Sequence, residues 1–360
     1  MKWFTNALIL TLNLIAAGIL IAINYVSVLP PSSVWSVFAF TNIFFSGFAI
    51  LNLLFIVWWI IRLRWFAVFS LIAIGLSFHN IAHTYVFFAP ESNTEINTEG
   101  YTIESYNLHH FLFFPDETGT KTGNSILDHI AQSDADVICL QEFSYSDYSP
   151  FTLKDIKKAL AHYPYSHIEF LYKDRYISKG IATFSKYKIK QKQRIHIPAK
   201  HHAAIATDIL IGDSVVRVIN CHLESNRLTD KDKKLTGISQ PEDIKSVIKT
   251  IQSKLYIGSR KRGEQALNIV SFVTNSTLPT IVCGDLNDIP TSYTYQLFSK
   301  HLTDVFTLFG KGFGNTFHEK LYQFRIDYFF VNNGIKPIQM EVNAFDKSDH
   351  YPLRMRFKMQ

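Results

Sequence analysis

Residues 281–290 read Ile-Val-Cys-Gly-Asp-Leu-Asn-Asp-Ile-Pro, an apolar and β-branched run that stops at a glycine and then turns polar. Such a run predicts a buried strand that delivers polar groups to its carboxyl end. Gly284 permits a sharp turn or a close backbone approach, while Asp285 and Asn287 point to the same side of an extended chain. A carboxylate beside a neutral amide suits a site that orients water and holds an anionic oxygen. Taken alone, the stretch is equally compatible with a plain turn after a strand.

Polar groups also end or closely follow other apolar runs of the chain, at Asn107, Glu142, His222 and Asp349-His350. Ligands of open α/β sheets gather at the carboxyl ends of strands, so these groups are candidates for one shared site. One carboxylate with an amide and few soft ligands suits a hard divalent cation such as Mg²⁺. A histidine alongside an aspartate suits proton handling or contact with an oxyanion.

Short strands separated by helices or turns, without heptads or repeats, indicate a mixed α/β domain. We expect strands over residues 102–106, 137–140, 181–184, 204–210 and 215–220 besides the one at 281. We expect helices over residues 124–133, 153–162 and 242–273, the last as one or two helices interrupted near Gly258. The division that follows is a membrane anchor over 1–90, a polar, turn-rich linker over 91–100 and a catalytic domain over 101–360.

Three long apolar runs, residues 8–29, 34–61 and 65–88, occupy the first ninety residues. Each supplies the roughly 18–20 largely apolar residues that cross a bilayer as a helix. A cleaved signal peptide would explain only the first run, and buried core helices would show an amphipathic period that these runs lack. The sequence therefore predicts an integral membrane protein with three transmembrane helices.

The few basic residues of this region predict its orientation. Lys2 precedes the first run, Arg62 and Arg64 separate the second from the third, and the loop from Pro30 to Ser33 carries no charge. The positive-inside rule then places the N-terminus in the cytoplasm. Three crossings place the catalytic domain on the outer side of the membrane, which we expect to be a bacterial inner membrane.

Three polar residues, His79, Asn80 and His83, lie in the outer half of the third run. Two interpretations stay open, packing at the interface or between helices, and contact with a lipid headgroup that enters the site.

The net charge of +6 overstates how basic the soluble part is. Removing Lys2, Arg62 and Arg64 from the 36 basic residues leaves 33 against 30 acidic residues, a net charge of +3. Dedicated duplex-DNA binders carry a stronger basic footprint. The three cysteines, Cys139, Cys221 and Cys283, lie in apolar runs and form no CxxC pair, so we expect buried strand residues without a zinc ribbon or disulfide framework.

Seven motifs in order give the chain a family resemblance. They are Ser105-Tyr106-Asn107, Leu140-Gln141-Glu142, Lys179-Gly180-Ile181-Ala182, Asn220-Cys221-His222-Leu223, Gly284-Asp285-Leu286-Asn287, Arg325-Ile326-Asp327-Tyr328 and Ser348-Asp349-His350. The set, over residues 101–357, resembles the endonuclease/exonuclease/phosphatase superfamily, which includes pancreatic-type deoxyribonucleases, abasic-site endonucleases, neutral sphingomyelinases and inositol-polyphosphate 5-phosphatases. The resemblance implies a four-layer α/β sandwich, two mixed sheets packed face to face with helices outside.

The resemblance also implies a metal site. Glu142 would be the main ligand of Mg²⁺, with Mn²⁺ as an alternative, and Asn107 would lie beside it. Asp349 would complete the metal or water network. A phosphodiester is anionic, so a cation must offset its charge before water attacks in line.

The remaining roles concern water and the phosphate. Asp285 would orient or deprotonate the attacking water, and Asn287 would hold a phosphate oxygen. His350 would contact the phosphate while Asp327 fixes its ring and charge, and His222 would contact the phosphate or assist the leaving group. The alternatives are a salt bridge of Asp327 with Arg325, and a purely structural role for His222.

Other polar groups predict a position in the structure but no definite role in the site. The pairs His109-His110 and His201-His202 have no recognisable cluster partner and are expected on the surface or in loops. Residues 259–262, Ser-Arg-Lys-Arg, read as a solvated helix start or as a contact for an anionic headgroup. Residues 310–316 lack a P-loop pattern and read as a surface loop beside the site.

The substrate is the least determined property, because the superfamily hydrolyses nucleic acids, phospholipids and soluble phosphoesters with one core. The membrane spans and mild charge favour a phosphoester of the membrane or envelope, such as a lipid headgroup. An outward-facing endonuclease or exonuclease is the alternative enzyme. An inactive family member that acts as a membrane receptor or scaffold is the alternative of another class.

Overall fold

The computed structural model describes residues 2–30, 40–88, 99–111, 123–146, 152–228, 241–319 and 323–360. The chain forms two compact units. The first comprises Met1–Phe87, Ser225–Gly263 and Ile289–Gln296, and the second comprises Phe88–Glu224, Glu264–Asp288 and Leu297–Gln360. The expected linker lies almost wholly outside the described residues, so the boundaries at residues 90 and 100 stay predictions.

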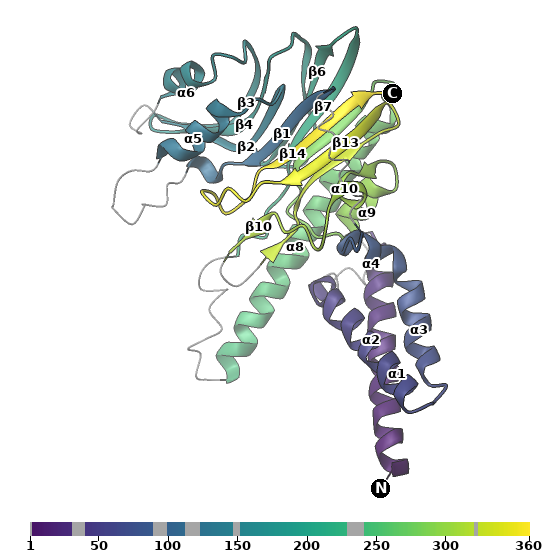
Figure 1. Cartoon of the computed structure of the whole chain (residues 1–360). Coiled ribbons are helices and arrows are strands. Elements are labelled where there is room, and N and C mark those ends of the chain that lie inside the picture. Colours follow the sequence, from purple (N-terminus) through teal and green to yellow (C-terminus); the bar gives the residue numbers. More distant parts are fainter. Residues whose placement is uncertain are drawn as a thin grey trace. The chain divides into compact units, whose positions relative to one another are not determined.

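The first unit contains the apolar helices α1 (Lys2–Val26), α2 (Phe45–Ile61), α3 (Ala67–Leu76) and α4 (Phe78–Thr84) (Figure 1). Two helical stretches, Phe4–Val26 and Phe40–Ile61, are long and apolar enough to cross a membrane. The third expected span is instead the pair α3 and α4, bent by 65° at Ser77. The structure therefore has two such helices, or three if the bent pair is one span.

Polar side chains inside these helices bond to one another. Asn13 Nδ2 donates to Ser70 Oγ at 2.5 Å, Ser70 Oγ donates to Asn52 Oδ1 at 2.8 Å, and Trp59 Nε1 donates to Asn13 Oδ1 at 2.8 Å. Such interhelical bonds join helices where water is absent. Asn80 also bonds to another helix, because its Nδ2 donates to Asn24 Oδ1 of α1 at 2.7 Å. Of the two interpretations of Asn80, this bond supports packing between helices.

The second unit contains two six-stranded sheets. The first has the order β13-β14-β1-β2-β4-β3, with strands Ile335–Val342, Leu353–Met359, Tyr101–Asn107, Val137–Tyr145, Ser178–Ser185 and Tyr165–Lys173. The second has the order β5-β6-β7-β8-β12-β9, with strands Ile189–Ile195, Ala203–Ile211, Ser214–His222, Thr280–Asp285, Asp327–Val331 and Thr303–Asp304. A small ribbon pairs β10 (Phe317–His318) with β11 (Gln323–Phe324).

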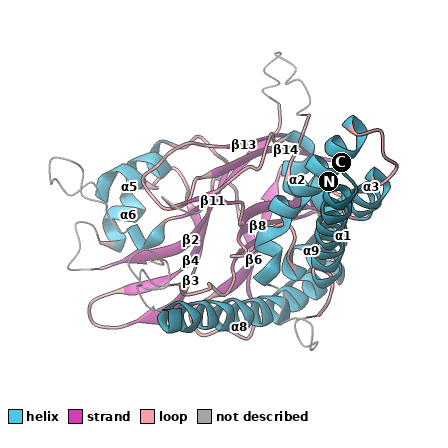
Figure 2. Cartoon of the chain, turned by 90° about the horizontal axis from the view of Figure 1, so that it is seen from below, coloured by secondary structure: helices cyan, strands magenta, loops and turns pink. Residues whose placement is uncertain are grey.

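Helices cover the outer faces of the sheets and complete the four-layer sandwich, so the expected fold is confirmed. Figure 2 shows α5 (Gly123–Gln132) and α6 (Leu153–Ala159) beside the sheet that contains β2, β3 and β4. Ile130 and Ile156 of these helices pack into one buried cluster with Leu140 of β2. On the second sheet, Phe298 of α9 (Tyr293–Ser299) stacks on Phe330 of β12, and Arg217 of β7 lies over Phe272 of α8 (Pro241–Thr274). The short α10 (Phe306–Phe309) follows β9.

The two sheets meet through a buried amide bridge. Gln141 of β2 donates from Nε2 to Asn220 Oδ1 of β7 at 2.7 Å, and Asn220 Nδ2 donates to the carbonyl oxygen of Ala182 in β4 at 2.9 Å. Unpaired buried amides are costly, so this bridge fixes how the facing strands align. The three cysteines are free and buried in strands, as expected.

Two expected boundaries are wrong. The helix α8 runs without interruption through Gly258. A Cβ at this position would lie 2.7 Å from Asn226 Oδ1, so the glycine allows a close contact and does not mark a break. The strand β2 does not end at Glu142 but continues to Tyr145, with an irregularity between Leu140 and Phe143. An extra residue in one strand of a pair bends the strand and re-aims its side chain.

Candidate functional site

The second sheet places three of the expected residues side by side. In the register of the strands, Asp285 of β8 is the partner of His222 in the parallel strand β7 and of Asp327 in the antiparallel strand β12. Gly284 makes this closeness possible, because its φ is +125° and a Cβ there would lie 2.0 Å from the carbonyl oxygen of Cys221. The glycine of the 281–290 stretch is therefore required by both conformation and space.

The first sheet contributes Asn107 and Glu142 to the same place. Asn107 Nδ2 donates to Asp285 Oδ2 at 3.0 Å, across 178 residues of sequence. Glu142, which occupies the bulge of β2 with a φ of 51°, brings its Oε1 to 3.6 Å from His222 Nε2. Side chains from both sheets thus converge at one edge of the sandwich.

Asp285 lies at the centre of the cluster and is 1% exposed. Asn287 holds it, since the Asn287 backbone N–H donates to Asp285 Oδ1 at 2.7 Å and the Asn287 Nδ2 donates to Oδ2 at 3.0 Å. Burial, followed by the nearby Asp327 carboxylate, raises the pKa of Asp285 to about 8. A carboxyl group poised near neutrality can exchange a proton with a bound water.

His350 and Asp327 form a buried pair, with Nδ1 and Oδ2 2.8 Å apart. Burial opposes the charge on the ring, but the carboxylates of Asp327 and Asp285 outweigh it and raise the pKa of His350 to about 10. His350 Nε2 lies 3.8 Å from Asp285 Oδ2. Arg325, the alternative partner of Asp327, donates from Nη1 to Asp304 Oδ2 at 2.6 Å.

Thr316 is a residue that sequence reasoning missed. Its Oγ1 accepts the backbone N–H of Asp327 at 3.0 Å and that of Ile326 at 3.1 Å, and its carbonyl oxygen accepts the N–H of Tyr351 at 2.7 Å. The end of the 310–316 loop therefore fixes the backbone on which both Asp327 and His350 stand. The only sequence signal is a threonine at the end of a glycine-rich loop.

His222 differs from His350 in charge. Burial, with His350 and His110 nearby, lowers the pKa of His222 to about 3, so its ring is neutral. Its Nε2 lies 3.7 Å from Asp285 Oδ2 and has no hydrogen-bond partner among the residues that the structure describes. A buried nitrogen without a partner, aimed between two carboxylates, suits a ligand from outside the chain.

Asp349 lies at the edge of the cluster and binds His109, with Oδ1 and Nδ1 3.0 Å apart. Burial works against its charge, but the His109 hydrogen bond and the nearby His350 lower the pKa of Asp349 to about 2. The neighbouring Ser348 donates from Oγ to the carbonyl oxygen of Asn107 at 2.9 Å. The C-terminal motif is thereby tied to β1.

Three histidines of the two pairs have carboxylate partners that the sequence does not reveal. His109 and His110 follow Asn107 in the short helix η2 (His109–Phe111), where they contact Asp349 and Glu142. Their closeness to Asn107 in sequence was the available signal. His202 is buried with its Nδ1 3.1 Å from Glu224 Oε2, and only His201 is exposed as expected.

Backbone strain gathers at this cluster. Among the described residues, seven that are not glycine have a positive φ, and five of them surround the site. These five are His109, His110, Phe111, Glu142 and Asn287. Left-handed conformations of such residues persist where the surroundings impose them, which is typical of functional sites.

The donor set fits a divalent cation. Asp285, Asp327 and His350 are all buried, and each offers a ligand atom within 4.8 Å of the others. Glu142, Asn107 and Asp349 add oxygen atoms from the first sheet and the C-terminal motif. Carboxylate and amide oxygens with imidazole nitrogens bind Mg²⁺, Mn²⁺ or Zn²⁺ according to their number and geometry.

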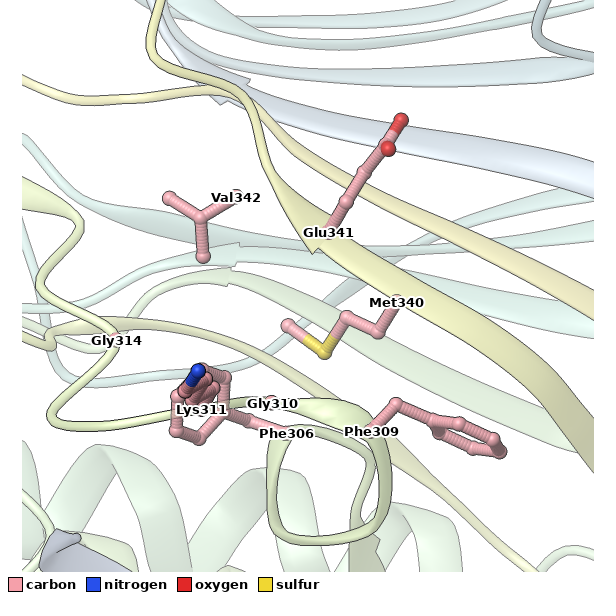
Figure 3. A pocket seen from close by; sticks show the side chains of 8 residues that line it. All are labelled: Phe306, Phe309, Gly310, Lys311, Gly314, Met340, Glu341 and Val342. Carbon is pink, nitrogen blue, oxygen red and sulfur yellow. The ribbon is translucent and has the colours of Figure 1, made fainter. Parts of the chain in front are cut away.

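A pocket of about 210 Å³ lies apart from these residues, between α10, the following loop and β13. Figure 3 shows Met340 and Val342 of β13 facing Phe306, Gly310 and Lys311. None of the clustered residues lines it. The candidate chemistry therefore belongs to the strand ends and not to this pocket.

Comparisons with known proteins agree with the geometry. The model of the Endonuclease/Exonuclease/phosphatase family matches residues 105–350, and a domain of unknown function (DUF8431) matches residues 6–84. No curated protein matches the chain.

Solved structures share the fold. An endonuclease/exonuclease/phosphatase from Beutenbergia cavernae has a TM-score of 0.52 at 17% identity, over 72% of this chain and 71% of that one. A family protein from Leptotrichia buccalis has a TM-score of 0.51 at 17% identity, over 72% and 99%. Humanized D. rerio TDP2 has a TM-score of 0.52 at 15% identity, over 72% and 99%.

Proposed function

We propose, from the premise that this chain belongs to the endonuclease/exonuclease/phosphatase family, that it is a divalent-metal-dependent hydrolase of phosphoester bonds. Members of the family are typically hydrolases of such bonds. One observation supports the proposal. Two sheets and the C-terminal motif bring five side chains together, those of Asn107, Glu142, His222, Asp285 and His350. Together these residues offer metal ligands, a proton acceptor and a cationic imidazole.

The metal would be held by Glu142, Asn107 and Asp349. Asp285, Asp327 and His350 would handle protons instead, because an imidazole that Asp327 keeps protonated has no lone pair for a cation. When bound, it would offset the charge of the phosphoester and polarise it toward attack. Mg²⁺ is the ion that we propose for this site, with Mn²⁺ as the alternative.

The residues of the chain would divide the rest of the reaction. Asp285 would accept the proton of the attacking water. Asn287 Nδ2 donates to Asp285 Oδ2 and to the carbonyl oxygen of Leu223, and it would give up one of these two bonds to hold a phosphate oxygen. His350, kept protonated by Asp327, would donate from Nε2 to the phosphoryl group, where negative charge develops. His222 would contact the phosphate beside the leaving oxygen as the ester bond breaks.

A membrane or envelope phosphoester, such as a lipid headgroup, is the substrate that we propose. Two helices long and apolar enough to span a membrane precede the catalytic residues, and residues 91–360 carry a net charge of only +3. Nucleic-acid binding depends on many basic contacts to phosphates, which makes an endonuclease or exonuclease the second candidate. An inactive receptor or scaffold is the third, although every polar position of the motifs is occupied.

A side-by-side substrate panel tests this proposal. The purified full chain in detergent is offered detergent-solubilised phospholipids and plasmid DNA, with Mg²⁺, with Mn²⁺ or with a chelator. We expect phospholipid hydrolysis only with metal, and loss of it in Glu142→Gln and in His350→Ala. Preferential nicking of the plasmid would favour the nuclease, and hydrolysis that survives chelation and both substitutions would overturn the proposed mechanism.

A further inference from the structure

The ring nitrogen of His110 that lies beside the Glu142 carboxylate is Nε2, and this atom carries no hydrogen to donate when the ring is neutral and Nδ1 is protonated. His110 Nδ1 lies 3.1 Å from the backbone carbonyl oxygen of Glu142, and His110 Nε2 lies 3.4 Å from Glu142 Oε2. A carbonyl oxygen only accepts, so Nδ1 carries the hydrogen and Nε2 of the neutral ring carries a lone pair. Two acceptors that face each other need a cation or a proton between them.

The orientation of this ring is the one found in metal-binding histidines. A histidine ligand commonly donates its second ring N–H to a backbone carbonyl, which fixes the tautomer and aims the other nitrogen at the metal. Here the carbonyl belongs to Glu142, whose own carboxylate is the proposed ligand. One residue thus both orients His110 and would share a cation with it.

A second imidazole lies on the other oxygen of the same carboxylate. His222 Nε2 is 3.6 Å from Glu142 Oε1, its residue is 8% exposed, and this nitrogen has no hydrogen-bond partner among the described residues. The Glu142 carboxylate therefore has an imidazole nitrogen beside each of its oxygens. This environment is richer in nitrogen than a site made for Mg²⁺ alone requires.

The backbone supports the placement of His110. Its φ is 57°, between His109 at 45° and Phe111 at 52°. Its carbonyl oxygen accepts a hydrogen bond from Ser144 Oγ at 2.8 Å, in the same strand as Glu142. The strained turn is therefore anchored to β2 in the conformation that brings the ring to the carboxylate.

We propose that His110 is a ligand of the cation held by Glu142, and that it makes the site prefer a first-row transition ion such as Mn²⁺ over Mg²⁺. The inference rests on the proposed function, because it takes Glu142 as a metal ligand. Imidazole nitrogen favours transition ions, whereas Mg²⁺ favours oxygen ligands. Removing this one nitrogen should weaken the binding of the two ions unequally.

Equilibrium dialysis of the full chain in detergent against Mn²⁺ or Mg²⁺ measures this preference without relying on activity. We expect wild type to bind Mn²⁺ at least about tenfold more tightly than Mg²⁺. His110→Gln should weaken Mn²⁺ binding about 10- to 100-fold and Mg²⁺ binding only slightly. His162→Gln, at an exposed histidine away from the cluster, is the matched control and should change neither.

The outcomes separate this inference from the proposed function. Equal weakening of both ions, or no change in His110→Gln, would overturn the inference while metal-dependent hydrolysis by wild type still stands. Failure of wild type to bind either ion or to hydrolyse a phosphoester would overturn the proposed function itself. Thermal unfolding of His110→Gln in chelator should match that of wild type, so that lost binding is not lost folding.

Discussion

His350 and Asp327 are joined by a hydrogen bond of 2.8 Å between Nδ1 and Oδ2, and both side chains are almost fully buried. The bond leaves Nε2 as the ring atom that faces Asp285, 3.8 Å away. Asp327 in turn is fixed by Thr316 through its backbone N–H. The pair is therefore built to present one nitrogen of a charged ring to the centre of the cluster.

Replacement of Asp327 by asparagine should lower kcat about 10²-fold or more, because the ring of His350 loses the charge that keeps it protonated and oriented. KM should change little. Steady-state kinetics with the preferred substrate measure both. Asp208→Asn is the matched control, since Asp208 is a buried partner of Arg217 in the same sheet but lies outside the cluster. An equal fall of kcat in both variants would mean that the effect is merely structural.

Replacement of Gly284 by alanine should destabilise the chain by more than about 3 kcal/mol, because the new Cβ would overlap the carbonyl oxygen of Cys221 at a φ that alanine disfavours. Gly312→Ala is the control, since Gly312 also has a positive φ, of 70°, but no atom within 4 Å of its Cβ position. It should cost about 1 kcal/mol. Chemical denaturation compares the two, and similar losses would show that space at Gly284 is unimportant.

The metal-free chain should lose stability as pH rises from about 6.5 to about 10. The pKa of His350 is about 10 and that of Asp285 about 8 in the folded chain, above the usual values of about 6.5 and about 3.9, so the folded state binds more protons in this range. The lowered pKa values of His222 and Asp349 act with the opposite sign, but only below about pH 6.5.

Thermal unfolding in chelator at pH 6.5 and at pH 9.5 measures this loss. We expect Tm to fall by at least about 2–4 °C, which corresponds to about 1 kcal/mol for a domain of this size. His350→Gln removes the group with the highest pKa of the cluster and should reduce the fall. A wild-type Tm that is flat or rises over this range would contradict the raised pKa values of His350 and Asp285.

The strand endings were the most predictable part of the site, because an apolar run followed by a polar residue is visible in sequence alone. Asp285 at the end of β8 and His222 at the end of β7 are both of this kind. Their closeness was not visible. The bond of Asn107 to Asp285 joins residues 178 apart in different sheets, and only the packing of the sheets, fixed by Gln141 and Asn220, brings them together.

The parts that sequence reasoning missed depend on backbone geometry. His110 reaches Glu142 only because its φ is positive and because Glu142 itself lies in a bulge, and neither feature has a signal in a histidine or a glutamate. Gly258 led to a wrong prediction of a helix break. A glycine inside a helix can mark a break or a close contact, and the sequence does not distinguish the two. The bend between α3 and α4 likewise falls at Ser77, with no proline to mark it.

This bend makes membrane orientation the property most open to test. If α3 and α4 together cross the membrane, Lys2, Arg62 and Arg64 lie in the cytoplasm and the clustered residues lie on the outer side, as the sequence predicts. If the pair only enters the membrane and returns, α1 and α2 are the two crossings among the described helices, and the clustered residues face the cytoplasm. The number of crossings thus decides which phosphoesters the cluster can meet.

A reporter fused after Gln360 distinguishes the two arrangements. Alkaline phosphatase is active only outside the cytoplasm, whereas green fluorescent protein exported in unfolded form does not fluoresce, so paired fusions give opposite signals. We expect an active phosphatase and a dark fluorescent protein. Fusions after Arg64, between the second and third expected spans, provide the internal control and should give the reverse. A fluorescent fusion at Gln360 would establish two crossings and would make a cytoplasmic phosphoester the substrate to seek.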